Sequence, residues 1–352
     1  MKRVGLLTAL MLAVAAAAAQ GSHWEFGLNG GMLNSNDFMV RKYSTATLGL
    51  DVAWLSHTSG DSSLRWSRYP EFGVRASFAA IPGGIAGNRF GAVGLIRVPF
   101  SRRLSYGIGV GLSAYTKPRY ITHNPENIYI SSLLCCLIDI GLTYRVNDRL
   151  NLTGSLLHSS NGNLVRPNKG LNFLQLGMAY RIGDVERISD WPDGREGIVC
   201  VPAYRHELGF TLSPGLCMSR HMCQYGVFFA YDVSLNYLYR LTCQTFVGGT
   251  VDLWYNCSHT WQREVYHDPY PMPVYLNAMV VVDERWGPVS LKAGAGVPLL
   301  KSSFVDIPIY ERVGVYYNWG RNYVGVAVNA HAAKAEFIEW SYGHRIPIGK
   351  NH

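Results

Sequence analysis

The feature that most constrains the fold is a regular alternation of apolar and polar residues in segments of about ten residues. In residues 149–158, one face of a strand with period two carries Leu150, Leu152, Gly154, Leu156 and His158. In residues 171–182, the same pattern places on one face Asn172, Leu174, Leu176, Met178 and Tyr180. Apolar-out and polar-in alternation over such segments is typical of outer-membrane β-barrels.

The two segments predict a β-hairpin. If His158 pairs with Asn172, the apolar faces meet as Leu156 with Leu174, Gly154 with Leu176, Leu152 with Met178, and Leu150 with Tyr180. By the same parity Ser160 shares the face of His158. We therefore expect His158, Ser160 and Asn172 to face lipid near one edge of the bilayer.

Composition agrees with a transmembrane barrel. The chain has 37 glycines, 12% aromatic residues and only 16% charged residues. After the N-terminal segment, no uncharged apolar stretch is long enough for a transmembrane helix. A secreted β-sandwich would share the alternation and is the alternative fold.

Sixteen segments are expected to be strands. The first eight are residues 23–33, 44–56, 71–80, 88–99, 103–114, 130–146, 149–158 and 171–182. The second eight are residues 204–217, 225–239, 241–256, 272–283, 288–298, 307–317, 322–331 and 335–346. Short and long connections alternate in the first set, as expected for periplasmic turns and outer loops, and residues 57–70 are a long exception.

The chain divides into four predicted parts. Lys2 and Arg3 before an apolar run to Ala19 predict a signal peptide over residues 1–19. We expect residues 20–183 to form a barrel half with the hairpin of residues 149–182, residues 184–203 a linker, and residues 204–352 a second barrel half. Short similarities between the halves indicate that the second is a degenerate repeat of the first, or they arise by chance between amphipathic strands of like composition. Spacing alone leaves open one wide barrel or two small ones. We expect one antiparallel transmembrane barrel of about 12–16 strands, because every segment carries a face compatible with lipid.

The hairpin tip brings together residues suited to acyl transfer. Neutral imidazole can accept the proton of a serine hydroxyl that attacks an acyl carbonyl, if a third group orients the ring. Here Ser160 would be the nucleophile, His158 the base and Asn172 the orienting group. Asn161 and Gly162 are the expected oxyanion donors. A bare H-x-S pattern also arises by chance in polar loops at a membrane boundary.

The string H-S-S-N-G, the following P-N-x-G-x-N and the apolar strand ending Ala179-Tyr180-Arg181-Ile182 resemble the active-site hairpin of lipid A 3-O-deacylases, the family that also includes longer acyloxyacyl hydrolases. The resemblance implies an outer-membrane serine esterase in which residues 20–183 are the deacylase-like barrel half. In it, His158 would be the base, Ser160 the nucleophile and Asn161 an oxyanion donor. Short members of the family carry glutamate at the position of Asn172. In the second half, His331 takes the place of His158, but Ala332 and Ala333 cannot supply a nucleophile.

The net charge of +8 bears on the substrate. Basic residues in the predicted outer loops would bind the phosphates of lipopolysaccharide, namely Lys117, Arg119, Arg166 and Lys169. Each of these charges, taken singly, could equally be an ordinary solvated side chain. Glu126 is a possible substitute carboxylate for His158. The basic residues are too scattered for a nucleic-acid interface.

Metal and cofactor roles have no support, because no metal-ligand or phosphate-binding motif is present. Seven cysteines leave at least one thiol unpaired, and a Cys217–Cys223 bridge is an open possibility.

The leading hypothesis is hydrolysis of an ester-linked 3-hydroxyacyl chain of lipid A by a barrel in the bacterial outer membrane. The alternatives are a channel or transport barrel that keeps the hairpin for structure, and a structural or adhesin barrel. Intact His158 and Ser160 favour catalysis, whereas Asn172 and the extra strands favour the alternatives.

Overall fold

The structure is a computed structural model. It describes residues 21–33, 46–58, 69–120, 122–162, 164–165, 167–185, 187–188, 203–218, 227–266, 273–300, 309–331 and 334–349. The predicted signal peptide and most of the predicted linker lie outside these residues. The chain forms two compact units with the main division near residue 198.

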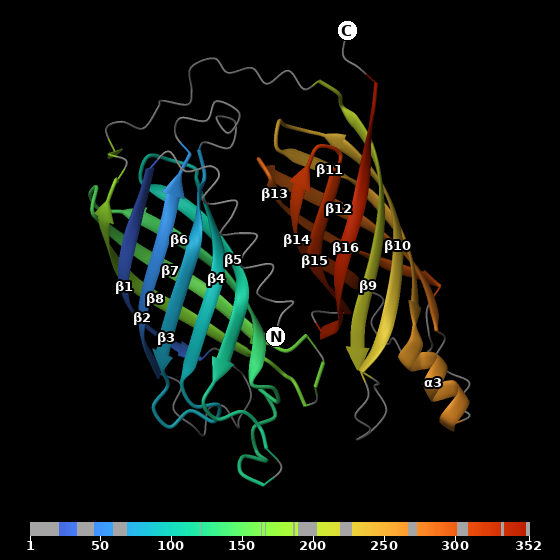
Figure 1. The fold of residues 1–352 in the computed structure, drawn as a ribbon, viewed down its shortest axis with the longest axis horizontal. Helices are drawn as coiled ribbons and strands as arrows, with labels where there is room; N and C mark the ends of the chain where they lie inside the picture. The colour runs from blue at the N-terminus through green and yellow to red at the C-terminus, as the bar shows by residue number, and fades with distance from the viewer. Residues whose placement is uncertain are drawn as a thin grey trace. The chain divides into compact units, whose positions relative to one another are not determined.

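The first unit is a closed antiparallel barrel of eight strands (Figure 1). Its strands are β1 (Gly21–Leu33), β2 (Ala46–His57), β3 (Glu71–Ala80), β4 (Arg89–Pro99), β5 (Leu104–Tyr115), β6 (Leu134–Arg145), β7 (Leu150–Ser160) and β8 (Leu171–Gly183). Each strand pairs with the next, and β8 pairs back onto β1, with Phe26 opposite Tyr180. Closure leaves no unpaired strand edge in this barrel.

The second unit is another closed barrel of eight strands. Its elements are β9 (His206–Met218), β10 (Val227–Arg240), β11 (Thr245–Asn256), the helix α3 (Cys257–Tyr266), β12 (Val274–Trp286), β13 (Val289–Leu300), β14 (Tyr310–Trp319), β15 (Asn322–His331) and β16 (Lys334–Ile348). Closure comes from β16 pairing with β9, where Ile338 lies opposite Leu216. Within the described residues, no helix has the length and hydropathy needed to cross a bilayer.

The antiparallel barrel fold and the sixteen strands are confirmed, but the single wide barrel is wrong. Strands of both barrels have the expected lipid-compatible face. Because this face is the same in one barrel or two, it could not predict which strands pair to close each barrel. Two strands also begin later than expected, because residues 241–244 belong to the turn before β11 and residues 130–133 belong to the loop before β6. There Asn127 Oδ1 accepts the backbone N–H groups of Tyr129 and Ile130 at 3.1 and 3.0 Å.

Charged side chains fill the first barrel at the end where its short turns lie. Arg97 donates two hydrogen bonds to Glu25, of 2.7 and 2.8 Å, and one to Glu71 at 3.0 Å. Arg145 and Arg181 donate to the other oxygen of Glu71 at 3.1 and 2.9 Å. Burial of these charges is tolerable because each carboxylate is paired and hydrogen-bonded.

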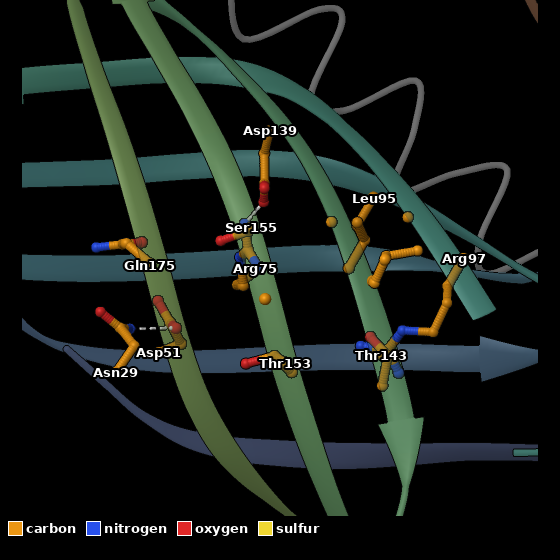
Figure 2. Close-up of a pocket in the computed structure, with 14 residues that line it drawn as sticks. Asn29, Asp51, Arg75, Leu95, Arg97, Asp139, Thr143, Thr153, Ser155 and Gln175 are labelled. Carbon is orange, nitrogen blue, oxygen red and sulfur yellow. Dashed lines mark hydrogen bonds and ion pairs between the residues drawn. The ribbon is translucent and has the colours of Figure 1, made fainter. Parts of the chain in front are cut away.

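A small polar cavity lies further along the same lumen (Figure 2). Its volume is about 40 Å³, room for about three water molecules. Asn29 donates to Asp51 at 2.6 Å, and Arg75 is paired with Asp139 across the cavity. The first barrel therefore has a packed interior, as expected for eight strands, and this cavity is small.

The second barrel is filled in the same manner. Arg312 pairs with Asp252 at 3.0 Å, with Glu339 at 3.3 Å and with Asp232. Near the end of β11, the buried Trp254 stacks on Tyr275 with ring centroids 4.7 Å apart.

The described cysteines differ in burial and in disulfide state. Cys135 is buried, and its neighbour Cys136 is half-buried on the opposite face of β6. Cys217 is not in a disulfide and its thiol donates to Asn256 Oδ1 at 3.2 Å, so the open possibility of a Cys217–Cys223 bridge is not realised. Cys243 is disulfide-bonded.

Candidate active site

The β7–β8 hairpin has the register predicted from its apolar pattern. His158 lies opposite Asn172, and the pairs Leu156–Leu174, Gly154–Leu176, Leu152–Met178 and Leu150–Tyr180 follow along the strands. The tip therefore sits where the alternation places it, because a shift by one residue would turn every leucine of this face inward.

His158 and Ser160 lie on the outward face of β7. The residues between and before them, Leu157 and Ser159, are buried in the barrel interior, at 1% and 0% exposure. His158 and Ser160 are half-buried, and Leu156 on the same face is exposed. Alternate residues of a strand have Cα atoms roughly 7 Å apart, so His158 and Ser160 are same-face neighbours.

Asn172 orients the imidazole. The Nδ1 atom of His158 lies 2.8 Å from Asn172 Oδ1. An amide oxygen only accepts hydrogen bonds, so this contact requires a proton on Nδ1. In the neutral ring, Nε2 is then the unprotonated nitrogen that can accept the proton of Ser160.

Gly170 lies beside both groups, and sequence reasoning did not select it. Its φ of 70° is in the region that favours glycine. A Cβ on Gly170 would lie 2.9 Å from His158 Cε1, 3.1 Å from Ser159 O and 3.2 Å from Ser160 Cβ. The missing side chain keeps space open between the base and the nucleophile. The P-N-x-G-x-N string contained this glycine, but its role becomes visible only from the φ angle and the close approach.

The inner face of the hairpin is held by the barrel interior. Ser159 on β7 and Ser113 on β5, the strands on either side of β6, share a buried hydrogen bond. Phe173, next to Asn172 in the chain, is fully buried, with the Arg89 guanidinium 4.9 Å from its ring centroid. These contacts pack the inner face of the two strands that carry His158 and Asn172, whose register is set by the pairing of β7 with β8.

The turn after Ser160 contains the predicted oxyanion residues. Asn161 is buried, and its backbone N–H donates to Asn168 Oδ1 at 3.2 Å. Gly162 has a φ of 62°. Because its backbone N–H already has an acceptor, Asn161 could stabilise an oxyanion only through its side-chain amide. Asn168 is a residue that sequence reasoning missed, and its carboxamide shapes this turn.

The loop between β5 and β6 is hydrogen-bonded to the loop between β7 and β8. The backbone N–H groups of Lys169 and Gly170 donate to Ile128 O at 3.2 Å and Tyr129 O at 3.1 Å. Ser131 donates its hydroxyl to Pro167 O. These contacts place the β5–β6 loop at the same end of the barrel as Ser160.

Three of the four predicted substrate-binding cations lie on these two loops. Lys117 and Lys169 are exposed, and Arg119 is half-buried. Lys169 Nζ also lies 5.9 Å from the centre of the Tyr129 ring. Arg166 lies outside the described residues.

Two further predictions concern Glu126, as a substitute partner of His158, and His331, as its counterpart in the second half. Glu126 is exposed on the β5–β6 loop, and the partner of His158 Nδ1 is Asn172 rather than this carboxylate. His331 ends β15, whereas Ala332 and Ala333 lie outside the described residues. No cluster of potential metal ligands occurs in the part of the chain that the structure describes.

Two family models match the chain. Residues 48–181 match lipid A 3-O-deacylase (PagL), and residues 206–349 match the C-terminal domain of acyloxyacyl hydrolase. The first match runs from within β2 to within β8 of the first barrel, and the second spans the second barrel. No curated protein matches the chain.

Solved structures with some similarity include a porin and a siderophore receptor. A variant of the Rh. blastica porin has 10% identity and a TM-score of 0.18, over 93% of this chain and 99% of the porin. The siderophore receptor PirA from Pseudomonas aeruginosa has 9% identity and a TM-score of 0.28, over 92% of this chain and 61% of the receptor. These superpositions are poor, so the fold assignment rests on the strand pairing.

Proposed function

Since the chain belongs to the lipid A 3-O-deacylase family in its long, two-domain form, we propose that it is a serine esterase that removes an ester-linked 3-hydroxyacyl chain from lipid A. Family membership supports lipid A deacylation in the outer membrane. The serine mechanism and the 3-hydroxyacyl chain are the finer parts of the proposal.

One observation carries the proposal. The 2.8 Å contact between His158 Nδ1 and Asn172 Oδ1 lies on the outward face of the barrel, with Ser160 as the next residue on that face. A base with a fixed tautomer beside a hydroxyl, at the edge of a membrane, is the arrangement that acyl transfer from a lipid requires.

The reaction follows from this geometry. His158 Nε2 accepts the proton of Ser160 as Oγ attacks the ester carbonyl. The bond to the sugar oxygen breaks, and His158 returns the proton to that oxygen. His158 then deprotonates a water molecule, which hydrolyses the acyl-enzyme and releases a 3-hydroxy fatty acid with Ser160 regenerated.

Two further groups assist. The side chain of Asn161 and the backbone N–H of Gly162 would stabilise the oxyanion. Lys117, Arg119, Arg166 and Lys169 would hold the lipid A phosphates at the level of the headgroups. The ester would then lie below these charges, at the depth of the hairpin tip.

The experiment is hydrolysis of purified lipid A by the purified protein in detergent micelles, with the released fatty acids identified by mass spectrometry. We expect free 3-hydroxy fatty acid from the unmodified protein and none from Ser160→Ala. Release of unsubstituted fatty acids only would contradict the proposed bond specificity. Release of the same product by Ser160→Ala would contradict the serine mechanism.

A further inference from the structure

A lipid A esterase must place the acyl chain of its substrate relative to the nucleophile. The sugar and phosphates stay at the headgroup level, so the acyl chain must run from Ser160 toward the bilayer centre along the outer face of the barrel. Two paths leave Ser160 in that direction, one along β8 and one along β6.

The path along β8 is obstructed by the catalytic machinery. Gly170 leaves space beside Ser160, but the next outward pair on this side is His158 with Asn172, hydrogen-bonded across the two strands. An acyl chain on this path would cover the polar pair and the imidazole that must exchange protons.

The path along β6 is apolar from its start. The register places Cys136 opposite Ser160, Ile138 opposite His158 and Ile140 opposite Leu156, all outward. Cys136 is small and half-buried, Ile138 is half-buried, and Ile140 is 55% exposed. This side therefore offers a small residue beside the nucleophile, followed by two aliphatic side chains.

We propose that the acyl chain to be removed lies along the outer face of β6 in a β6 lane formed by Cys136, Ile138 and Ile140, so that these residues determine which chain lengths are hydrolysed. The proposal rests on the esterase function proposed above. From Cys136 to Ile140 the strand rises roughly 13 Å, close to the depth of one bilayer leaflet. The lane therefore contacts a long acyl chain over much of its length and a short chain only at its start.

The chain offers a matched pair of positions for the test. Ile140 and Leu174 both flank Leu156, one from β6 and one from β8, and they are 55% and 47% exposed. The probes are p-nitrophenyl butanoate and p-nitrophenyl dodecanoate in mixed micelles, and the readout is the ratio of kcat/KM for the long ester to that for the short ester. Heat-modifiable migration on gels establishes that each variant is a folded barrel.

We expect Ile140→Trp to lower the long-to-short ratio about tenfold, because the indole occupies the lane. Leu174→Trp should leave the ratio as in the unmodified protein. If Ile140→Trp does not fold, Ile138→Trp replaces it with the same expectation. A ratio that falls in Leu174→Trp instead, falls equally in both variants or falls in neither would overturn the β6 lane while the esterase function stands. An unmodified protein that hydrolyses neither ester nor lipid A would overturn the proposed function, and the β6 lane with it.

Discussion

At the scale of single residues, the site depends on an amide in the position where a carboxylate would stabilise the imidazolium more strongly. Asn172 Oδ1 accepts a hydrogen bond from the Nδ1–H group of His158, with the two atoms 2.8 Å apart. This contact fixes the ring and its tautomer, but an uncharged oxygen adds little electrostatic stabilisation to the protonated ring. Asn172 therefore orients the imidazole of His158 but does not stabilise its positive charge.

The first prediction separates these two effects. Asn172→Leu removes the acceptor and should lower kcat on lipid A about a hundredfold, because the ring loses its tautomer and direction. Asn172→Asp should keep kcat or raise it, since a carboxylate both orients and stabilises the imidazolium. Steady-state kinetics in micelles measures both variants. Full activity of Asn172→Leu would show that another group orients His158.

The second prediction concerns the space between base and nucleophile. Gly170→Ala places a Cβ 2.9 Å from His158 Cε1, in a backbone conformation that alanine adopts only with strain. We expect kcat to fall about a hundredfold in a barrel that still folds. Gly154→Ala on the same hairpin is the control, because its Cβ would make only an ordinary 3.4 Å contact with Leu176. Equal activities of the two variants would refute the role of Gly170.

The residues of the site were only partly predictable. Alternation and register sufficed for His158, Ser160 and Asn172, because a strand fixes the face of every second side chain. Gly170 and Asn168 were missed, since their roles depend on loop dihedral angles and on a side-chain contact with the backbone of Asn161.

At the scale of elements, the hairpin is positioned from both sides. The buried Phe173, with the Arg89 guanidinium over its ring, packs its inner face, and the β5–β6 loop holds its tip. Asn127 organises that loop, because its fully buried amide donates to Lys117 O at 3.0 Å and accepts two backbone N–H groups.

The third prediction tests this loop. Asn127→Ala removes the acceptor of the Tyr129 and Ile130 N–H groups, a loss of about 1–3 kcal/mol for the loop alone, whereas Lys117 O keeps its hydrogen bond from Asn124. We expect faster proteolytic cleavage within residues 116–133 and a KM for lipid A that rises about fivefold, because Lys117 and Arg119 lose their fixed positions. The exposed His123 of the same loop provides the control His123→Ala, which should resemble the unmodified protein. Unchanged cleavage and KM in Asn127→Ala would show that the loop is held by its other contacts.

The elements themselves were largely predictable, with strand ends within a few residues of those observed. The pattern failed in residues 130–133, Ile-Ser-Ser-Leu, because the loop there is set by two contacts that composition does not reveal: Ile130 N–H with Asn127 Oδ1, and the Ser131 hydroxyl with Pro167 O.

At the scale of the whole molecule, the chain is two closed barrels rather than one. The sequence could not decide this, because closure depends on which edge strands exchange backbone hydrogen bonds, and every strand has the same kind of face. The consequence is functional. One barrel of sixteen strands would enclose a channel, whereas eight strands enclose an interior that side chains fill.

The fourth prediction follows from these packed interiors. The charged network around Glu71 in the first barrel and around Arg312 in the second should block ion flow. We expect the full chain in planar bilayers to show no steady porin-like conductance. Stable open-channel steps would favour the transport alternative over an esterase.

The most direct test of the central claim is the lipid A of Gram-negative cells that express the chain, its Ser160→Ala variant or its Ser159→Ala variant. The two serines are neighbours, but Ser160 faces the membrane and Ser159 is buried in the lumen. The account predicts that mass spectra show lipid A lacking one 3-hydroxyacyl chain with the unmodified protein and with Ser159→Ala, and intact lipid A with Ser160→Ala. Deacylation by a folded Ser160→Ala barrel, or intact lipid A in all three strains with folded barrels, would contradict it.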